Sequence, residues 1–373
     1  VILSYKYRLF TNRAQTESLN EMLGDFCGLY NACLQQRIEA WERAGKGLGF
    51  VDQANELKAC RTAEPDLARW SFSAEQQVIR RLQKSFDAFF KRIKRGDKPG
   101  FPRFRASSRF HSADFRVGDG LTIRKSNRLT VVGVPGEIKV KWHRELPSKP
   151  KSAILTRSLG KWYIVFHVEV ECADAVDGQS VGIDLGLTDL VAMSTGETVA
   201  RPNFTKVHTK GLRRRQRELA RARRGSKRRA KTRRRLAVYQ RNVASRRRDF
   251  THKLSADLVK RFGKIAFEDL NIKGLARGML AKHVNDALWA QIIAFTTYKA
   301  EKAGGVVVCV DPRGTSQTCP DCGQIAKKLL SQRMHICDCG CRMLRDVASG
   351  IVIHDRAFGH GACPRTPSQR VAA

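Results

Sequence analysis

Three acidic side chains occur in contexts that could place them in one metal-binding site. Asp184 lies inside the apolar run 181–186, Glu268 ends the apolar run 265–267, and Asp346 follows a group of cysteines. A carboxylate in such a run is costly to bury without a cation or a hydrogen-bond donor. Taken singly, each acid is also compatible with an exposed position or an arginine pair. Together they predict oxygen ligands of the kind that suits Mg²⁺ or Mn²⁺.

The cysteines predict a second kind of metal site. Of 11 cysteines, five lie between residues 319 and 341, beginning with a C-x-x-C pair followed by glycine. Thiolate pairs at this separation are typical of a structural zinc ribbon, which has almost no core without its metal. The expected ligands are Cys319, Cys322, Cys337 and Cys339. Cys341 could replace Cys339, His335 is a further alternative, and free cysteines in a mobile loop are the remaining interpretation.

The charge of the chain indicates a polyanionic partner. Lys and Arg total 70 residues against 35 Asp and Glu, a formal net charge of +35. Such a surface repels itself unless a polyanion neutralises it, and nucleic acid is the expected one. A membrane partner is not expected, because no apolar run approaches the roughly 20 residues that span a bilayer. The N-terminus lacks the pattern of a secretory signal, and the clustered cysteines favour the cytoplasm.

The first 171 residues combine helices with short strands. Residues 1–10 alternate like a strand, whereas residues 14–45 and 73–95 have helical spacing. Aromatic and basic residues then interleave, and Arg103, Phe104 and Arg105 are candidates for stacking bases and holding phosphates. The alternative is that the phenylalanines of this stretch anchor a loop to the core. Short strands over about 115–171 predict a small antiparallel sheet or barrel, into which the first strand could pair.

From residue 181 onward, strands alternate with helices around one very basic segment. Residues 204–250 contain 20 Lys and Arg, with a turn signal at Gly225-Ser226. A charge run is usually a solvated face or a disordered tail. A thin apolar stripe instead favours a basic helical hairpin that lies along a nucleic-acid backbone. Its candidate contact residues are Arg213, Arg214, Arg215, Arg228, Arg229, Arg233 and Arg234.

The order of these motifs resembles a known nuclease family. Two strand acids and a third at a later helix start form the arrangement of RNase H-like nucleases, whose carboxylates hold two divalent ions about 4 Å apart. Over nearly its whole length the chain resembles TnpB, the transposon-encoded RNA-guided DNA endonucleases related to compact type V CRISPR effectors. The matching segments are residues 181–187, 267–274, 315–323 and Arg345-Asp346, together with Tyr7-Arg8-Leu9-Phe10 and residues 100–104.

The resemblance implies a mixed α+β and α/β multidomain fold. An antiparallel wedge barrel carrying a helical recognition insert would precede an RNase H-like (RuvC) nuclease domain with an inserted zinc ribbon. The implied ranges are 1–10 for the first barrel strand, 11–105 for the helical recognition domain, 106–177 for the rest of the barrel, 178–312 for the first nuclease part with the basic hairpin 204–250, 313–342 for a zinc ribbon that binds target nucleic acid, 343–358 for the second nuclease part and 359–373 for a disordered tail.

The same resemblance implies partners, cofactors and residue roles. Asp184, Glu268 and Asp346 would be catalytic and bind Mg²⁺ or Mn²⁺, while Zn²⁺ would occupy the ribbon. The protein would bind a guide RNA made from the transposon end, one protein per RNA, and cut both strands of matching DNA beside a short adjacent motif. Arg313, Arg333 and Arg345 are candidates for stabilising transition-state charge. The expected location is the cytoplasm, at the prokaryotic nucleoid.

One motif departs from the family pattern. The third family motif commonly reads Asp-Arg-Asp-x-Asn-Ala-Ala, whereas residues 344–350 read Leu-Arg-Asp-Val-Ala-Ser-Gly. The acid is retained, but Gly350 in a helix costs about 1 kcal/mol relative to alanine. The alternatives that stay open are a nuclease-deficient RNA-guided DNA-binding regulator, a strand-transfer transposase, and a basic RNA-binding zinc protein without catalysis.

Overall fold

The structure is a computed structural model that describes residues 1–174, 178–278, 281–329 and 331–359. The chain forms two compact units, here called the N-terminal unit (Ile2–Val170) and the C-terminal unit (Val1 and Glu171–Ala373). Most of the expected disordered tail lies outside the described residues. Among the residues described, no helix has the length and apolarity needed to cross a bilayer.

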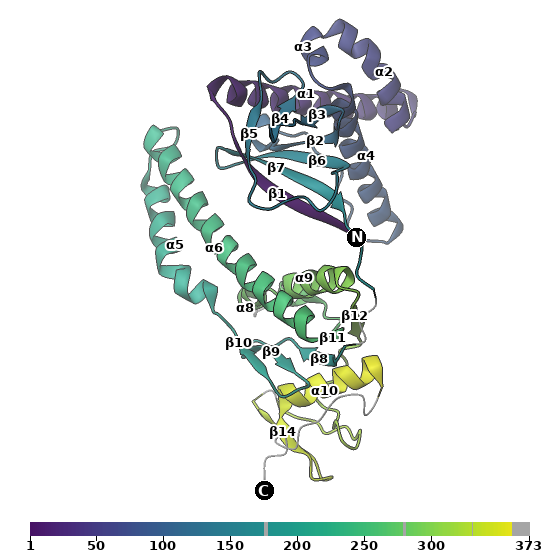
Figure 1. The fold of residues 1–373 in the computed structure, drawn as a ribbon, viewed down its shortest axis with the longest axis vertical. Helices are drawn as coiled ribbons and strands as arrows, with labels where there is room; N and C mark the ends of the chain where they lie inside the picture. Colours follow the sequence, from purple (N-terminus) through teal and green to yellow (C-terminus); the bar gives the residue numbers. More distant parts are fainter. Residues whose placement is uncertain (175–177, 279–280, 330, 360–373) are drawn as a thin grey trace. The chain divides into compact units, whose positions relative to one another are not determined.

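The N-terminal unit consists of a β-barrel with helices inserted after its first strand (Figure 1). Its elements are β1 (Ile2–Phe10), α1 (Arg13–Ala44), α2 (Phe50–Ala63), α3 (Pro65–Ala68), α4 (Phe72–Lys94), the 3-10 turn η1 (Ser107–Arg109), β2 (Ser112–Val117), β3 (Gly120–Ile123), β4 (Arg128–Val131), β5 (Ile138–Lys141), β6 (Ser152–Ser158) and β7 (Lys161–Glu169).

The barrel is closed in the order β1-β5-β4-β3-β2-β6-β7. The expectation that the first strand pairs into the barrel is confirmed, because β1 is antiparallel to both β5 and β7. The expectation of a wholly antiparallel barrel is wrong at one place, where β2 and β3 pair in parallel. Gly118 and Gly120, with φ of 93° and 82°, let the chain loop tightly between those strands.

Capping residues set the ends of the long helices in this unit. Asn12 and Gln15 form a capping box at the start of α1, and Gly45 ends it in the left-handed conformation. Ser71 caps α4. One face of each helix packs with the barrel interior in a single core, which includes Phe26 and Leu82. The helices α2 and α3 were not predicted, because only Gln53 and Leu57 of α2 are buried and its apolar spacing is weak.

The C-terminal unit is an α/β structure built around one five-stranded sheet (Figure 1). Its elements are β8 (Ser180–Asp184), β9 (Asp189–Met193), β10 (Thr198–Ala200), α5 (Phe204–Arg221), α6 (Lys227–Arg261), β11 (Lys264–Glu268), α7 (Ile272–Leu275), α8 (Ala281–Ala287), α9 (Trp289–Lys302), β12 (Val306–Val310), β13 (Met334–Ile336), β14 (Arg342–Leu344) and α10 (Arg345–Phe358).

The sheet has the order β10-β9-β8-β11-β12, and its three strands β8, β11 and β12 run parallel. Side chains alternate between its two faces. Val181, Ile183 and Phe267 enter a core with residues of α6 and α9. The opposite face is covered by α10, which makes its most extensive contacts with β8. Asp184 and Glu268 therefore share the face that α10 covers.

The basic segment forms a helical hairpin of α5 and α6, which turns between Ala222 and Ser226 as expected. The second helix continues to Arg261, well beyond the expected end at residue 250. Its last three turns bury Thr251, Leu254, Ser255 and Leu258 against the sheet core and α9. The hairpin is thus anchored at its C-terminal end, while its most basic part carries almost no buried side chains.

Candidate active site

The first two acids stand at the carboxyl ends of neighbouring parallel strands. Asp184 is the last residue of β8 and Glu268 the last of β11. The pairing of Phe267 with Ile183 places the two acids at adjacent positions. Because residues at alternate positions face the same side, both carboxylates point toward α10. The site therefore arises from two neighbouring parallel strands that lie far apart in the sequence, with β9, β10, α5 and α6 between them.

The third acid is placed by α10, which lies unusually close to β8. Asp346 is in the first turn of this helix, close enough for its charge to raise the pKa of Asp184 at the end of β8. Small residues allow the close approach, since a Cβ built on Gly182 would lie 2.1 Å from the carbonyl oxygen of Gly350. A Cβ on Gly350 would itself lie 3.0 Å from the backbone nitrogen of Ser194. Gly350 thus allows α10 to pack closely against the sheet. Helix propensity alone does not predict this role.

A buried histidine fixes the same helix to the same strand. His354 of α10 is completely buried, and its Nε2 lies 2.7 Å from the hydroxyl oxygen of Ser180. Its Nδ1 lies 3.2 Å from a carboxylate oxygen of Asp355. Each ring nitrogen therefore has a polar partner, as buried polar groups require. These contacts hold α10 in register along β8, and so hold Asp346 relative to Asp184.

The electrostatics of the site disfavour three simultaneous negative charges. Burial raises the pKa of Asp184 to about 8, the charges of Glu268 and Asp346 add to this rise, and Arg345 opposes it. Burial also raises the pKa of Glu268, which is only 7% exposed. Oxygen donors that repel one another in a partly dry site are a donor set that fits hard divalent cations. The residues present therefore fit Mg²⁺ or Mn²⁺.

The three acids are neighbours without converging on a single point. Among the described residues, the groups whose ligand atoms all lie within 4.8 Å of one another contain cysteine and histidine, not these carboxylates. In a site with two ions 3.5–4 Å apart, the outer carboxylates bind different ions and need not meet. Two ions that share these carboxylates would not require all three acids to meet at one point.

Two residues that the sequence did not single out contact or influence Glu268. The hydroxyl of buried Thr315 donates to its carboxylate, and the positive charge of Arg356 lowers its pKa. Arg356 is held by hydrogen bonds from its Nη1 to the backbone oxygens of Asp311 and Arg313. Thr315 lies in a motif that resembles the family, which could have drawn attention to it. Arg356 is one of 70 basic residues, and nothing in the sequence distinguishes it.

The three arginines considered for transition-state stabilisation differ in position. Arg345 is mostly buried, with its Nε 3.6 Å from a carboxylate oxygen of Asp346 and its Nη1 3.2 Å from the carbonyl oxygen of Leu329. Arg313 and Arg333 have exposed side chains. Arg345 is therefore the one that the structure places beside the acids.

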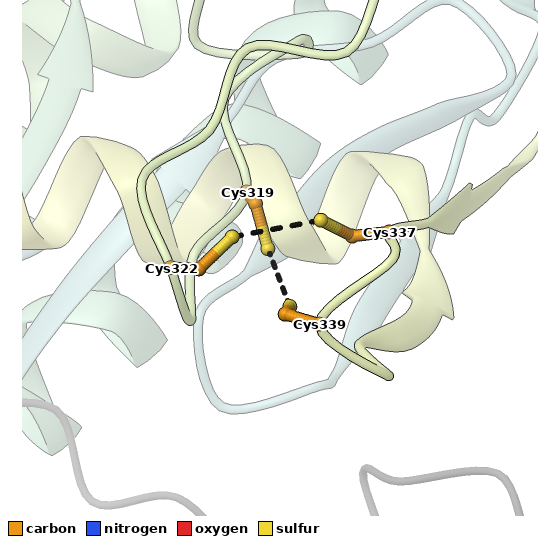
Figure 2. A group of neighbouring side chains, drawn as sticks. All are labelled: Cys319, Cys322, Cys337 and Cys339. Atoms are coloured by element: carbon orange, nitrogen blue, oxygen red, sulfur yellow. Dashed lines mark hydrogen bonds between the residues drawn. The ribbon is translucent and has the colours of Figure 1, made fainter.

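The cysteine segment brings four sulfurs together, as Figure 2 shows. Cys319 Sγ lies 3.6 Å from Cys339 Sγ, and Cys322 Sγ lies 3.5 Å from Cys337 Sγ. Four sulfurs at about 2.3 Å from a tetrahedral zinc ion would be separated by about 3.8 Å. The observed separations are close to that value and far longer than the roughly 2.05 Å of a disulfide. This set is the one expected from the sequence spacing, and it fits zinc.

The basic hairpin presents most of its candidate residues to solvent. Arg213, Arg214, Arg228, Arg233 and Arg234 are exposed. Two others are engaged within the hairpin itself. Arg215 stacks on the ring of Tyr239 at 4.1 Å, and Arg229 donates to the carbonyl oxygens of Leu219 and Ala222. Open hollows of about 890 and 600 Å³ lie along its surface and are lined mainly by cationic side chains.

Both interpretations of the aromatic and basic stretch apply, to different residues. Phe110 and Phe115 are buried in the core, whereas Phe101 and Phe104 are about half exposed. Arg103 and Arg105 are exposed beside them. The backbone of Arg105 is fixed to α1 by two hydrogen bonds with the Asn31 side chain, of 2.8 and 2.9 Å. A hollow of about 700 Å³ between α4 and this stretch is lined by cations including Lys84 and Arg92.

Comparison with known proteins decides the family. A protein of Streptomyces pristinaespiralis described as "Putative RNA-guided DNA endonuclease" is 30% identical, over 98% of this chain and 93% of its own length. The chain belongs to the TnpB family. "Putative RNA-guided DNA endonuclease InsQ" of Escherichia coli (strain K12) is 26% identical, over 90% of this chain and 87% of that protein.

Family models and a solved structure agree with this assignment. The models described as "Probable transposase", "Cas12f1-like, TNB domain" and "Helix-turn-helix domain" match residues 163–279, 289–353 and 1–46. Residues 1–46 fold as one strand and one 32-residue helix, not as a helix-turn-helix. A chain from a Cas12f1-sgRNA-target DNA complex is alike in fold, with a TM-score of 0.60 at 14% identity, over 92% of this chain and 83% of that one.

Proposed function

We propose that this TnpB-family chain is an RNA-guided DNA endonuclease of a transposable element. Its relatives are named as RNA-guided DNA endonucleases, and the likeness in fold includes a chain solved with single guide RNA and target DNA. The observation that carries the proposal is the adjacency of Asp184 and Glu268 on parallel strands, with Asp346 brought beside them by α10. The partners are a guide RNA from the transposon end and matching double-stranded DNA beside a short motif.

The carboxylates would bind two Mg²⁺ or Mn²⁺ ions for phosphodiester hydrolysis. Such ions lower the pKa of the attacking water and stabilise the leaving 3′-oxygen. The chain's own contribution is to hold the ligands in place. Thr315 orients one oxygen of Glu268, His354 and Ser180 fix α10, and the Arg345 charge lies beside Asp346. Arg345 is the residue we assign to stabilising charge on the phosphate.

The two units would divide the work of recognition and cutting. The barrel with its helical insert would be the wedge and recognition part, and the C-terminal unit would be the RuvC nuclease with a zinc ribbon at 313–342 that contacts target nucleic acid. Zinc bound by Cys319, Cys322, Cys337 and Cys339 would order this ribbon, which leads directly into α10. The metal would thereby influence the position of Asp346. Such a protein acts at the nucleoid, in the cytoplasm.

Two basic surfaces would hold the nucleic acid. The exposed arginines of the α5–α6 hairpin, including Arg213, Arg214 and Arg233, would follow a phosphate backbone. Arg215 and Arg229, which are engaged within the hairpin, would stabilise it instead. In the N-terminal unit, Phe104 would stack on an unpaired base while Arg103 and Arg105 bind phosphates. Sequence specificity would come from base pairing with the guide RNA.

The decisive test is a cleavage assay on protein co-expressed with its native transposon end. The substrate is a plasmid with a guide-matched site beside a randomised flank, with Mg²⁺ or EDTA. Cutting should require guide match, flank and metal, and it should disappear in Asp184→Ala but persist in Asp66→Ala, an exposed acid of α3. Guide-dependent binding without cutting would indicate the nuclease-deficient regulator. Absence of guide-dependent binding would overturn both.

A further inference from the structure

A second group of metal-ligand side chains lies against the four-cysteine cluster. Cys319, His335 and Cys341 have ligand atoms that all lie within 4.8 Å of one another. All three are buried, with exposed fractions of 1%, 0% and 4%. By contrast, Cys322 and Cys339 of the first group are exposed. A single tetrahedral zinc ion needs only the first four thiolates, so Cys341 and His335 remain to be explained.

The hairpin of β13 and β14 places these two side chains on its inner face. His335 pairs with Met343, and both are buried, whereas Met334 and Ile336 on the outer face are exposed. Cys341 directly precedes β14 and belongs to the small core with Met343 and Val347 of α10. The group is thus enclosed between the hairpin, the C-x-x-C turn and the start of α10.

Two features of this group are unusual for an ordinary protein core. His335 Nε2 is buried, and no described residue meets hydrogen-bond geometry with it, while Nδ1 contacts Lys328 Nζ. In addition, the side chain of Asp321 lies within hydrogen-bonding reach of Cys341. A buried imidazole nitrogen that lacks a hydrogen bond with any described residue, next to two buried thiols, is poorly stabilised in a metal-free core.

We propose that the segment binds a second zinc ion, with Cys319 as a bridging thiolate and His335, Cys341 and Asp321 as the other ligands. Nitrogen, sulfur and carboxylate oxygen are all common zinc donors, and four of them complete a tetrahedral structural site. The bridge follows from Cys319 being the one residue that both groups share. The proposal presupposes the four-cysteine zinc site, because that ion would hold Cys319 deprotonated for the second.

The surrounding charges agree with a bridged pair of ions. Adding a second divalent ion with one more thiolate and one carboxylate leaves the formal charge of the cluster unchanged. Lys328 lies close enough to feel the charges of Cys319, Cys341 and Cys337 and offsets part of that charge.

Zinc content measured on the full chain, purified with its RNA, tests the proposal. The measurement uses an Asp184→Ala background, so that zinc bound by the carboxylate site is not counted. We expect about two zinc ions per chain, falling to about one in Cys341→Ser and in His335→Ala. Cys309→Ser, which removes an exposed thiol of β12, should leave about two. About one zinc in the unsubstituted background, or about two in both cluster variants, would overturn the second site.

A cobalt titration of the unsubstituted cluster gives a result even where the buried variants fail to fold. The absorbance of the thiolate-to-cobalt charge-transfer band should rise with the first equivalent of Co²⁺. It should rise again, less steeply, with the second equivalent, because the second set of ligands adds fewer thiolates. Asp321→Asn, at a partly exposed position, should weaken only the second rise. A single rise complete at one equivalent would refute the second site while leaving the first intact. No rise at all would refute both zinc sites but not the nuclease proposal.

Discussion

Glu75 in the N-terminal unit and the acids at the strand ends of the C-terminal unit are buried in opposite ways. In the N-terminal unit, the fully buried Glu75 is paired with Arg61, whose guanidinium also binds the carbonyl oxygens of Ala68 and Trp70. In the C-terminal unit, Asp184 and Glu268 face each other and Asp346. A buried charge paired inside the protein serves packing, whereas buried like charges need a cation from outside. The contrast separates a structural acid from a metal-binding site.

The pKa values express the same contrast with different causes. Burial raises the pKa of Glu75 to about 7, and Arg61 opposes that rise. For Asp184 the neighbouring carboxylates add to the effect of burial and outweigh Arg345. A raised pKa alone therefore does not identify a functional acid. The sign of the neighbouring charge does.

The largest expected effect comes from Asp184→Asn. Cleavage should fall by about 10³-fold or more, because metal ligation contributes several kcal/mol to the barrier. Thermal stability measured in EDTA at pH 9, above the raised pKa of Asp184, should rise, since one of three repelling charges is gone. Glu75→Gln is the matched control and should leave the cleavage rate unchanged. If the Asn variant were less stable than the parent in EDTA, the carboxylates would not repel each other as described.

Breaking the structural pair should have the next largest effect, on folding alone. Arg61→Met leaves Glu75 buried without its cation and should destabilise the N-terminal unit by about 3–5 kcal/mol at pH 8. Arg13→Met removes the partner of Glu17 in an exposed pair and should cost at most about 1 kcal/mol. Chemical denaturation followed by circular dichroism measures both. Equal losses in the two variants would mean that burial of Glu75 does not matter.

The difference in the pH dependence of stability between the parent and Glu75→Gln isolates Glu75, because Asp184 and Glu268 also have raised pKa values. Its folded-state pKa of about 7 exceeds its ordinary value of 4.5, so the folded state holds a proton that the unfolded state has lost. The contribution of Glu75 to the free energy of unfolding is thus fully present below about pH 4.5, and it is lost as the pH rises through 7. The loss should approach about 3 kcal/mol for a rise in pKa from 4.5 to about 7. Glu75→Gln should flatten the decline between pH 5 and 7, and an unchanged slope would contradict the assignment.

Sequence patterns indicated the acids of the proposed active site, but not the buried acid Glu75. Asp184 and Glu268 stood out because an acid interrupts or ends an apolar strand, and the C-x-x-C pair stood out through its local spacing. Glu75 gave no signal, because an acid in the first turn of a helix is ordinary. Arg356 and the parallel pairing of β2 with β3 were equally hidden. The role of Arg356 depends on contacts between distant segments, and the β2–β3 pairing depends on glycine conformation. Neither can be predicted from the spacing of residue types along the chain.

The same reasoning explains why Gly350 was first interpreted as a weakness. Helix propensity is a local quantity, and it correctly assigns a cost to glycine. The structure adds a contact that propensity ignores, since Gly350 and Gly182 are where α10 meets β8. The departure from the family motif therefore accompanies a close helix–sheet approach.

The close contact between α10 and β8 at Gly182 gives the smallest and most specific of the expected effects. A Cβ on Gly182 would meet backbone atoms of Gly350 and His354 at 2.1 and 2.5 Å, which cannot move independently of α10. Gly182→Ala should therefore shift the helix and cost about 1–3 kcal/mol of stability. Gly24→Ala, in α1 with nothing within 4 Å of the added carbon, should instead stabilise by up to about 1 kcal/mol.

The cleavage reaction then shows whether this contact positions Asp346 or only stabilises the fold. Displacing α10 moves Asp346 away from Asp184, so Gly182→Ala should need more Mg²⁺ for half-maximal cleavage at a temperature where the protein remains folded. A variant that is less stable but has the parental Mg²⁺ dependence would assign the contact to packing alone. The carboxylates would then be positioned by the strand ends, with α10 free to adjust.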